Sequence, residues 1–571
     1  MTRTTTSGAA MTANPALLLI LGAAGVPLLR GLPRRTLMAA VPVAGLVLLW
    51  ALPEGAASGL QFLGLELIPV RVDALSRVFA TGFLIAALLT MVYAMHLRDT
   101  LQQATILVYA AAAVGGTLAG DLVTLFVFWE LAGLSSAFLI WAGRNERSHR
   151  AATRYLAVQL LSGLLMLAGI VLRVQSGAGL EFGHLGLDAP GGALILAAIG
   201  IKCAFPLLHS WLTDTYPEAT IVGAVALSAF TTKFAVYTLA RGFAGTEMLV
   251  WIGLVMAVFP IFYAVIENDL RRVLAYSMIN QLGFMVVGVG IGGALGINGA
   301  SAHAVADMVF KGLLFMSVGA VMLRTGTANG SDLGGLYKSM PQTAALCMVG
   351  AASISAFPLF SGFATKSLIM EAVGQEHLTV AWLLLLFASA GVFHHAGIKI
   401  PYFAFFAHDR GYRVAEAPLN MRAAMAMAAV VCVAIGVAPS LLYGMLPYAV
   451  DYAPYTTAHV INQLQLLLLA ALAFTVLVRT GLYPPELRSV NVDADYVYRR
   501  ALPQGWRALS RAADAGRGRA GPVLRRRSKE IWEIATGPLR PGSRVAGPWS
   551  THLMVWWTAL ALGAMLLLAF L

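Results

Sequence analysis

The chain has 571 residues, of which 59% are hydrophobic and only 12% are charged, and its formal net charge is +12. Soluble proteins carry about 25% charged residues. This composition therefore excludes an ordinary soluble globular protein and indicates a chain with many membrane-spanning segments.

Apolar stretches of about 20 residues, the length that crosses a bilayer, begin near Pro15, Leu37, Val72, Gln103 and Leu122 and recur to the C-terminus. This criterion gives about 14–16 spans, so the predicted fold is an all-α polytopic membrane protein. The opening MTRTTTSGAAMTANP lacks the charged, apolar and small-residue order of a cleavable signal. We therefore expect the first span to remain.

Basic residues in short loops orient the chain, because Lys and Arg concentrate on the cytoplasmic side. Loops after odd-numbered spans hold the basic clusters, namely Arg30, Arg34 and Arg35, then Arg144, Arg147, Arg150 and Arg154, Arg271 and Arg272, Arg324 and Lys338, and Arg410 and Arg413. Loops after even-numbered spans carry at most single arginines. The pattern predicts that the N-terminus lies outside and the odd-numbered loops lie in the cytoplasm. The expected location is a bacterial-type inner (cell) membrane.

One span contains a lysine within apolar sequence, in the stretch GIKCAFPLLHSWL at 200–212. The bilayer penalises a charge at a helix centre by about 2.5–3.5 kcal/mol on insertion scales, so Lys202 is expected to face protein or water. The alternative, snorkelling to the interface, requires a position near a helix end. Pro206 leaves the carbonyl of Lys202 without its helical partner, which predicts a broken helix that is buried or lines a cavity.

The same construction recurs in SISAFPLFSGFATKSLIM at 353–370, where Pro358 and Gly362 precede Lys366. Two interrupted helices in corresponding halves of a membrane chain are the best sequence indication of an ion site at a repeat interface. The sequence thus predicts two broken helices, each accompanied by a lysine.

Further ionisable residues lie inside apolar spans, namely Glu130, Lys233, His303, Asp307 and Lys311. The last three are spaced four residues apart and share one helix face, so Asp307 is expected to reach Lys311. The alternatives are a Glu130 that only neutralises a nearby lysine, and a His303 face that lies near the surface.

Three more residues are accessory candidates. His209 follows the first predicted break, and His395 and Lys399 lie in HHAGIKIPYF at 394–403. Interface anchoring is the alternative for the last two, because they are close to a helix end.

The excess positive charge concentrates at residues 497–545, which contain twelve basic residues and only three acidic ones, Asp514, Glu530 and Glu533. A basic run beside a membrane is more typical of anionic lipid contact or of topology than of nucleic-acid binding, so we predict no nucleic-acid partner. The stretches WRALSRAADAGRGRA and SKEIWEIATGPL fit short amphipathic helices on the interface, and a flexible basic loop is the alternative.

Signals for redox, metal or nucleotide chemistry are missing from the sequence. Cys203, Cys347 and Cys432 are far apart, without a CxxC pair, and neither GxGxxG nor a GxxxxGK phosphate loop occurs. We therefore predict no metal, no cofactor and no catalytic residue in this chain. Whether it belongs to a redox-driven complex stays open.

Several stretches together resemble the proton-conducting antiporter family, which includes the A and D subunits of Mrp-type multisubunit cation/proton antiporters and the antiporter-like subunits of respiratory complex I. The motifs are WEL at 129–131, KCAFPLLHSWLTDTYPEAT at 202–220, LRRVLAYSMINQLGF at 270–284, FKGLLFMSVGAV around Lys311 and GFATK at 362–366. The resemblance covers roughly residues 70–450, and YPEAT with HAGIKIPYFAFF makes it closest to the D subunit.

The resemblance implies a proton-translocating membrane subunit of a multisubunit monovalent cation/proton antiporter. It implies two inverted repeats of five helices, spans 4–8 and 9–13, with spans 7 and 12 broken. Residue by residue, the proton pathway it implies contains Glu130, Lys202, Lys233, His303, Lys311 and Lys366. Asp307 stands where family members often have a second histidine, so the central relay is altered here.

The resemblance also implies partners, which are the other subunits of a hetero-oligomeric membrane complex, together with protons and Na+ or K+. Anionic lipids are expected at the basic loop. Two alternatives remain. One is the same module in a redox, hydrogenase or inorganic-carbon uptake complex related to complex I, and the other is a scaffold without transport, which the ionisable residues disfavour.

On this basis the predicted organisation is a series of five parts. They are N-terminal transmembrane helices at 1–98, the antiporter core at 99–410, accessory transmembrane helices at 411–484, a cytoplasmic basic loop at 485–548 and a terminal span at 549–571. The last two parts are not standard for the D subunit and are similar to the lateral helix and terminal span of the longest complex I antiporter-like subunit.

Overall fold

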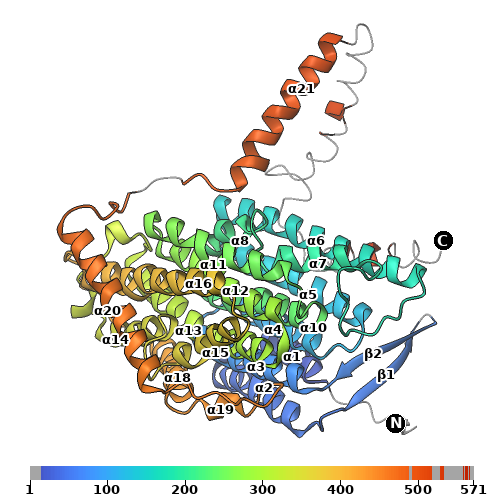
Figure 1. Ribbon diagram of the computed structural model, residues 1–571, viewed down its shortest axis with the longest axis horizontal. Helices are drawn as coiled ribbons and strands as arrows, with labels where there is room; N and C mark the ends of the chain where they lie inside the picture. The colour runs from blue at the N-terminus through green and yellow to red at the C-terminus, as the bar shows by residue number, and fades with distance from the viewer. Residues whose placement is uncertain are drawn as a thin grey trace. The chain divides into compact units, whose positions relative to one another are not determined.

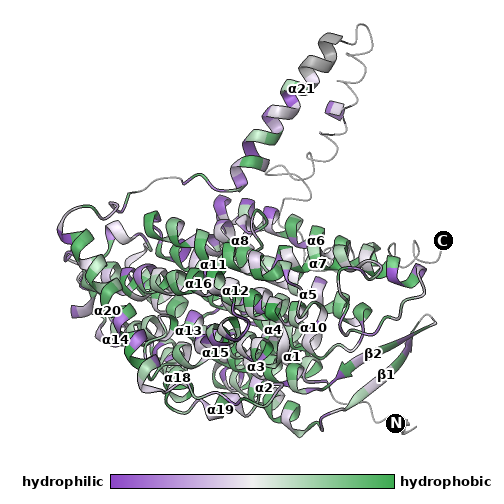
Figure 2. Cartoon of the chain, viewed as in Figure 1, coloured by the Kyte–Doolittle hydropathy of each residue, from purple (hydrophilic) through white to green (hydrophobic). Residues whose placement is uncertain are grey.

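The computed structural model describes residues 14–62, 64–487, 491–516, 528–530, 532, 557–558, 560–562 and 565. The chain divides into two units, residues 1–493 and 494–571. The first unit is a stack of helices (Figure 1), and hydrophobic residues cover most of its ribbon (Figure 2). Within the described residues, twelve helices are long and apolar enough to cross a membrane. This confirms the prediction of an all-α polytopic membrane protein.

The N-terminal part contains three helices and one element that the sequence analysis missed. The helices are α1 (Pro15–Gly25), α2 (Gly31–Ala51) and α3 (Ala74–Tyr93). Between α2 and α3 lies an antiparallel hairpin of β1 (Ala57–Phe62) and β2 (Leu65–Arg71), in which Ala57 pairs with Arg71. The hairpin is at the lower right of Figure 1.

The next helices form two runs of five spans. The first run is α4 (Thr100–Leu118), α5 (Leu122–Trp141), α6 (Glu146–Gln175), α7 (Gly192–Lys202) with α8 (Ser210–Thr215), and α9 (Ile221–Ala229) with α10 (Thr231–Gly242). The second is α11 (Met248–Ile266), α12 (Leu270–Ile291), α13 (Gly293–Thr325), α14 (Pro341–Ile354) with α15 (Ser361–Gln375), and α16 (Thr379–Val392), which continues through η6 (Phe393–Ile398), α17 (Lys399–Pro401) and η7 (Tyr402–Phe406).

The remaining elements are shorter or peripheral. Short 3-10 turns are η1 (Val26–Leu28), η2 (Ala94–His96), η3 (Tyr216–Glu218), η4 (Gly330–Asp332) and η5 (Leu336–Lys338), while η6 and η7 are π-helical. The first unit ends with α18 (Leu419–Val437), α19 (Ser440–Tyr443) and α20 (Thr457–Arg479), and the second contains η8 (Val497–Ala501) and α21 (Leu502–Gly516).

Both predicted helix breaks are present, and they have the same backbone structure. The tetrapeptide AFPL occupies residues 204–207 in one break and 356–359 in the other, and in each copy the Ala and the Leu have a positive φ. The Phe amide donates to the carbonyl five residues earlier, from Phe205 to Gly200 at 2.9 Å and from Phe357 to Ala352 at 3.0 Å. A non-glycine residue in this φ region is uncommon. Its occurrence twice in each break indicates a repeated structural unit.

Aspartate and asparagine side chains fix the starts of four spans. Asp99, Asp121, Asn145 and Asp269 accept hydrogen bonds from backbone amides in the first turn of α4, α5, α6 and α12. Such caps stabilise a helix start by about 1 kcal/mol each. The polar residues between apolar stretches therefore set where these helices begin.

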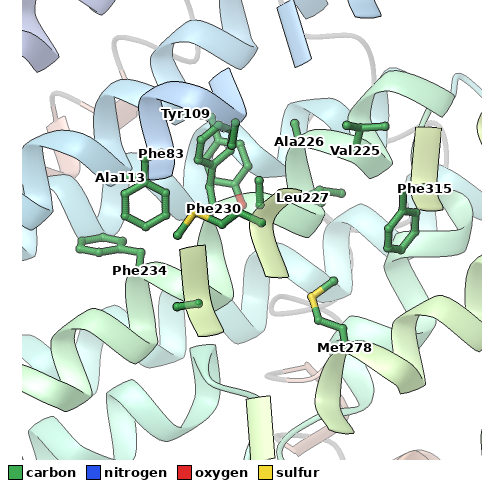
Figure 3. Packing of buried hydrophobic residues seen from close by; sticks show 14 of the residues in the cluster. Phe83, Tyr109, Ala113, Val225, Ala226, Leu227, Phe230, Phe234, Met278 and Phe315 are labelled. Atoms are coloured by element: carbon green, nitrogen blue, oxygen red, sulfur yellow. The ribbon is translucent and has the colours of Figure 1, made fainter. Parts of the chain in front are cut away.

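Aromatic rings fill the core where α3, α4 and the α9–α10 junction meet (Figure 3). The ring of Phe230 lies 4.9 Å from that of Tyr109 and 6.0 Å from that of Phe83. Phe230 is also the junction between α9 and α10. Its anchored ring therefore holds the point at which this span is interrupted.

The second unit bears on two predictions about the basic loop. Residues 506–516 of the first proposed amphipathic stretch are helical in α21, whose exposed Leu502, Trp506 and Leu509 recur at helical spacing. The arginines at 525–527, most of SKEIWEIATGPL and most of the predicted terminal span 549–571 lie outside the described residues.

Close packing of α11 on α12 generates the first prediction. A Cβ at Gly283 would lie 2.6 Å from the carbonyl oxygen of Gly253, so the two backbones touch without side chains between them. We expect Gly283→Val to destabilise the protein by about 1–3 kcal/mol, the usual cost of overpacking. Thermal unfolding of the purified protein in detergent measures this. The control is Gly374→Val, because nothing lies within 4 Å of a Cβ there. Equal melting temperatures for the two variants would contradict the close approach.

Candidate functional site

Lys202 is the last residue of α7 and is fully buried. Its ammonium donates to the carbonyl oxygen of Trp129 on α5 at 2.5 Å and lies 4.3 Å from the centre of the Trp129 ring. The break at AFPL ends the helix at the lysine, and cations are favoured at this negative end of a helix. The side chain therefore faces protein, and snorkelling does not describe its position.

Glu130 follows Trp129 and is half-buried. Its charge and that of Lys202 interact, yet among the described residues no ion pair within 4.0 Å joins them. The carboxylate rests on Gly163 of α6, where a Cβ would overlap Glu130 Oε1. The glycine therefore makes the space in which this carboxylate sits.

A hydrogen-bonded brace holds the three helices around this pair. The indole of Trp129 donates to Ser162 Oγ at 3.0 Å, and that hydroxyl donates to the carbonyl oxygen of Ala198 on α7 at 2.7 Å. Nearby, both polar atoms of the Gln159 amide are buried without a hydrogen-bond partner in the described part of the chain. The brace fixes the backbone of the three helices, and the Gln159 amide remains available for hydrogen bonding beside Glu130 and Lys202.

Lys233 on α10 and Asp307 on α13 form a fully buried ion pair with an N–O distance of 2.5 Å. Lys233 also donates to the carbonyl oxygen of Ser228 at 2.8 Å, a group in the last turn of α9 just before the interruption at Phe230. Asp307 also interacts electrostatically with Lys311, as expected, but its close ion pair is with Lys233 on α10, which the sequence analysis did not predict. One residue from each run of five spans thus forms the pair.

Lys311 and His303 lie on the same helix as Asp307 and have neutral partners. Lys311 donates to Ser277 Oγ on α12 at 2.8 Å. The His303 ring has Nδ1 at 3.0 Å from Thr365 Oγ1 and Nε2 at 3.1 Å from Gln281 Oε1. Both residues are fully buried. A surface position for the His303 face is therefore excluded.

Lys366 reaches back from α15 across the second break. Its ammonium donates to the carbonyl oxygen of Ile354, the last residue of α14, at 2.8 Å and lies 5.1 Å from the Phe284 ring. Lys202 and Lys366 occupy different positions relative to AFPL: Lys202 is itself the last residue of the interrupted α7, whereas the Lys366 ammonium binds the last carbonyl of the interrupted α14. Together the residues form a buried row in which four ammonium groups accompany two carboxylates.

The accessory candidates lie outside this row. His209 has Nε2 at 3.1 Å from Asp493, which also accepts from the Tyr276 hydroxyl at 2.7 Å. His395 is fully buried and interacts electrostatically with Lys311 and Lys399. Lys399 is fully buried, so it is no interface anchor.

Sequence reasoning missed Glu486 and Asp493 as partners of these residues. Glu486 lies 2.9 Å from Lys399, and Asp493 contacts His209. Both follow α20 in a stretch without apolar periodicity, so the only available signal was two acidic residues just before a strongly basic region. Within the described residues, no three His, Cys, Asp or Glu side chains gather as metal ligands.

Comparison with known proteins gives a consistent result. The sequence profile described as NADH:quinone oxidoreductase/Mrp antiporter, TM, matches residues 119–393. The D subunit of a Na(+)/H(+) antiporter of Alkalihalophilus pseudofirmus is 30% identical over 318 residues, which are 50% of this chain and 63% of that protein. The L subunit of an F(420)H(2) dehydrogenase of Methanosarcina mazei is 32% identical over 312 residues, 46% of each chain.

A solved structure is similar over nearly the whole chain. A protein in the Mrp complex from Dietzia sp. DQ12-45-1b superposes with a TM-score of 0.75 at 25% identity, covering 96% of this chain and 66% of that one. With three curated relatives the match spans only part of their length, between 37% and 53% of each.

The buried Lys233–Asp307 pair generates the second prediction. Removing one partner of a buried pair costs about 3–5 kcal/mol, since a charge is left uncompensated. We expect Lys233→Met and Asp307→Asn each to lower the melting temperature of the purified protein, and the loss in the double variant to be smaller than the sum of the two single losses.

The exposed pair Lys338–Asp409, with an N–O distance of 2.8 Å, is the matched control. Lys338→Met and Asp409→Asn should leave the melting temperature unchanged, because solvent screens such pairs. Strictly additive losses for the buried pair would mean that Lys233 and Asp307 do not interact.

Proposed function

The chain belongs to the family of NADH:quinone oxidoreductase and Mrp antiporter transmembrane subunits, and on this premise we propose that it is a proton-translocating subunit of a multisubunit monovalent cation/proton antiporter, similar to the Mrp D subunit. The single observation that carries the proposal is the buried row of ionisable residues through both runs of five spans. Intramembrane charges are rare and mark ion pathways or proton relays.

The contacts suggest how a proton moves along the row. A lysine beside a carboxylate holds its proton more strongly than one beside neutral groups. Lys202 alternates between a position near Glu130 and one toward Lys233, and Asp307 then determines which neighbouring lysine carries the charge. His303 can donate from either ring nitrogen to Gln281 or Thr365, so it suits the relay beside Lys366.

Helix breaks give the row its freedom of movement. The AFPL segments end α7 and α14 within the bundle, so the backbone beside Lys202 and Lys366 is not held by a continuous helical ladder. Discontinuous helices at ion sites are typical of transporters, because their ends supply oriented dipoles and adaptable geometry.

A redox-driven complex is the second candidate function. The similarity to the L subunit of F(420)H(2) dehydrogenase favours it, because the same module occurs in a dehydrogenase. Adjacent genes decide between the candidates: genes for small antiporter subunits support the first, and genes for iron–sulfur and quinone-site subunits support the second. In either case we propose a hetero-oligomeric complex in a bacterial-type cell membrane, with the N-terminus outside and the basic loop cytoplasmic.

The third prediction tests the proton-carrying role of Lys202. Arginine at this position keeps the charge but cannot release its proton, since its pKa exceeds about 12. We expect Lys202→Arg to assemble into the complex and to reduce proton uptake into vesicles at least about tenfold. Immunoblotting of the purified complex controls for assembly. Near-normal uptake would reduce Lys202 to a fixed counter-charge.

The fourth prediction concerns the space beside Glu130. Gly163→Ala should displace the carboxylate rather than unfold the helix, because the overlapping atom is the end of a flexible side chain. A misplaced proton group commonly costs about ten- to hundredfold in rate, so proton uptake should fall while complex yield stays normal. Gly374→Ala, with open space at its Cβ, is the control. Equal uptake by the two variants would show that the position of Glu130 is unimportant.

A further inference from the structure

The Lys399 ammonium is surrounded by oxygen atoms, and most of them belong to the backbone. Carbonyl oxygens of Glu267, Val265 and Ala264 lie at 2.6, 2.7 and 3.2 Å, and Glu486 Oε1 lies at 2.9 Å. We call these four oxygens the oxygen cage. Three are backbone carbonyl oxygens at the end of α11, and one belongs to a carboxylate. The ammonium inside it is fully buried.

The cage has the composition of an alkali-cation site. Backbone carbonyls at the C-terminal end of a broken or ending helix, together with a carboxylate, are the groups that coordinate Na+ in transporters and K+ in channel filters. Here the carbonyls come from the last residues of α11 and the residue that caps it. A protonated lysine carries the same single positive charge as Na+ or K+, so its ammonium stands in the place of such an ion.

Lys399 lies on an irregular helical segment. The residue lies in a three-residue α-helical turn between two π-helical segments, η6 and η7. π-helical turns occur frequently at functional sites and distort the regular backbone ladder. The irregular backbone beside Lys399 therefore marks this segment as a candidate functional site.

We propose that the oxygen cage binds a monovalent alkali cation, Na+ or K+, in alternation with the Lys399 ammonium. This inference rests on the proposed antiporter function and names its cation site. The Glu267 carboxylate also interacts with Lys399, but it is paired with Arg272 at 3.7 Å. When Lys399 becomes neutral, the negative charge of Glu486 is therefore left unbalanced in the cage, and one cation restores the balance. Entry of one proton onto the lysine expels one cation, so the exchange is one for one.

His395 interacts electrostatically with both the cage and the proton row. It is fully buried and interacts electrostatically with Lys311 on one side and Lys399 on the other. The adjacent His394 ring has both nitrogens buried without a hydrogen-bond partner in the described part of the chain. His395 is therefore the buried imidazole within electrostatic range of both the cage lysine and a lysine of the proton row.

The competing explanation is that Lys399 only caps the C-terminus of α11, as basic side chains do elsewhere. The two accounts differ in a measurable way. A cap needs no metal ion, whereas alternation requires that the cation and the proton on Lys399 exclude each other.

The test measures equilibrium binding of radioactive sodium and rubidium ions to the purified whole complex over a series of pH values, with rubidium replacing potassium. In the wild type, apparent affinity for one of the two ions should fall by up to about tenfold per pH unit on acidification, the limit for competition with one proton. In Lys399→Met the cage is open at every pH, so binding should persist and lose this pH dependence. Glu486→Gln should weaken binding at every pH.

Lys338→Met is the matched control, since that lysine is exposed and outside the cage. Melting temperatures in sodium, rubidium and choline salts distinguish a folding defect from a loss of ion binding. A bound ion stabilises the folded state, so the melting temperature of Lys399→Met should rise more in the alkali salt than in choline. Absence of alkali binding at all pH values, or unchanged pH dependence in Lys399→Met, would overturn the inference. If either of these results occurs while wild-type vesicles still take up protons, only the cation site is refuted and the proposed function stands. If wild-type vesicles take up no protons, the proposed function itself is refuted.

Discussion

The ammonium–carbonyl contact is the interaction on which the rest of the site depends. In a bilayer, backbone carbonyls that lose their helical partner must be satisfied within the protein, because water does not reach them. At three places a lysine supplies the donor: Lys233 at Ser228, Lys366 at Ile354, and Lys399 at the end of α11. The same contact stabilises an interrupted helix and holds a buried positive charge.

The site contains fewer carboxylates than lysines. The positions of the carboxylates therefore determine which lysines have a charged partner and whether that partner lies in the same run of spans. Glu130 belongs to the first run of spans and sits over Gly163, within electrostatic reach of Lys202. Asp307 belongs to the second run and pairs with a lysine of the first. Glu486 follows both runs and meets Lys399. Under the proposed function, a charge that shifts at one of these groups would change the partners available to the next, and this would couple the two halves of the chain.

Features that depend on a local residue pattern could be predicted from the sequence. Lysines within apolar runs, each close to a proline, and a glycine near the second break predicted both interrupted helices. The partner of Asp307 could not be predicted, because the helical spacing that favoured Lys311 says nothing about a lysine on a distant span. The carbonyls around Lys399 and the hairpin at 57–71 likewise depend on tertiary packing that leaves no periodic trace.

Time-resolved infrared spectroscopy of the intact complex in vesicles tests the central claim most directly, which is that buried carboxylates and lysines exchange protons along the row. The account predicts that a pH jump changes the absorption of protonated carboxyl groups, that Glu130→Gln and Asp307→Asn each remove part of this change, and that its time course matches proton uptake. Carboxyl bands that stay constant while protons cross the membrane would contradict it.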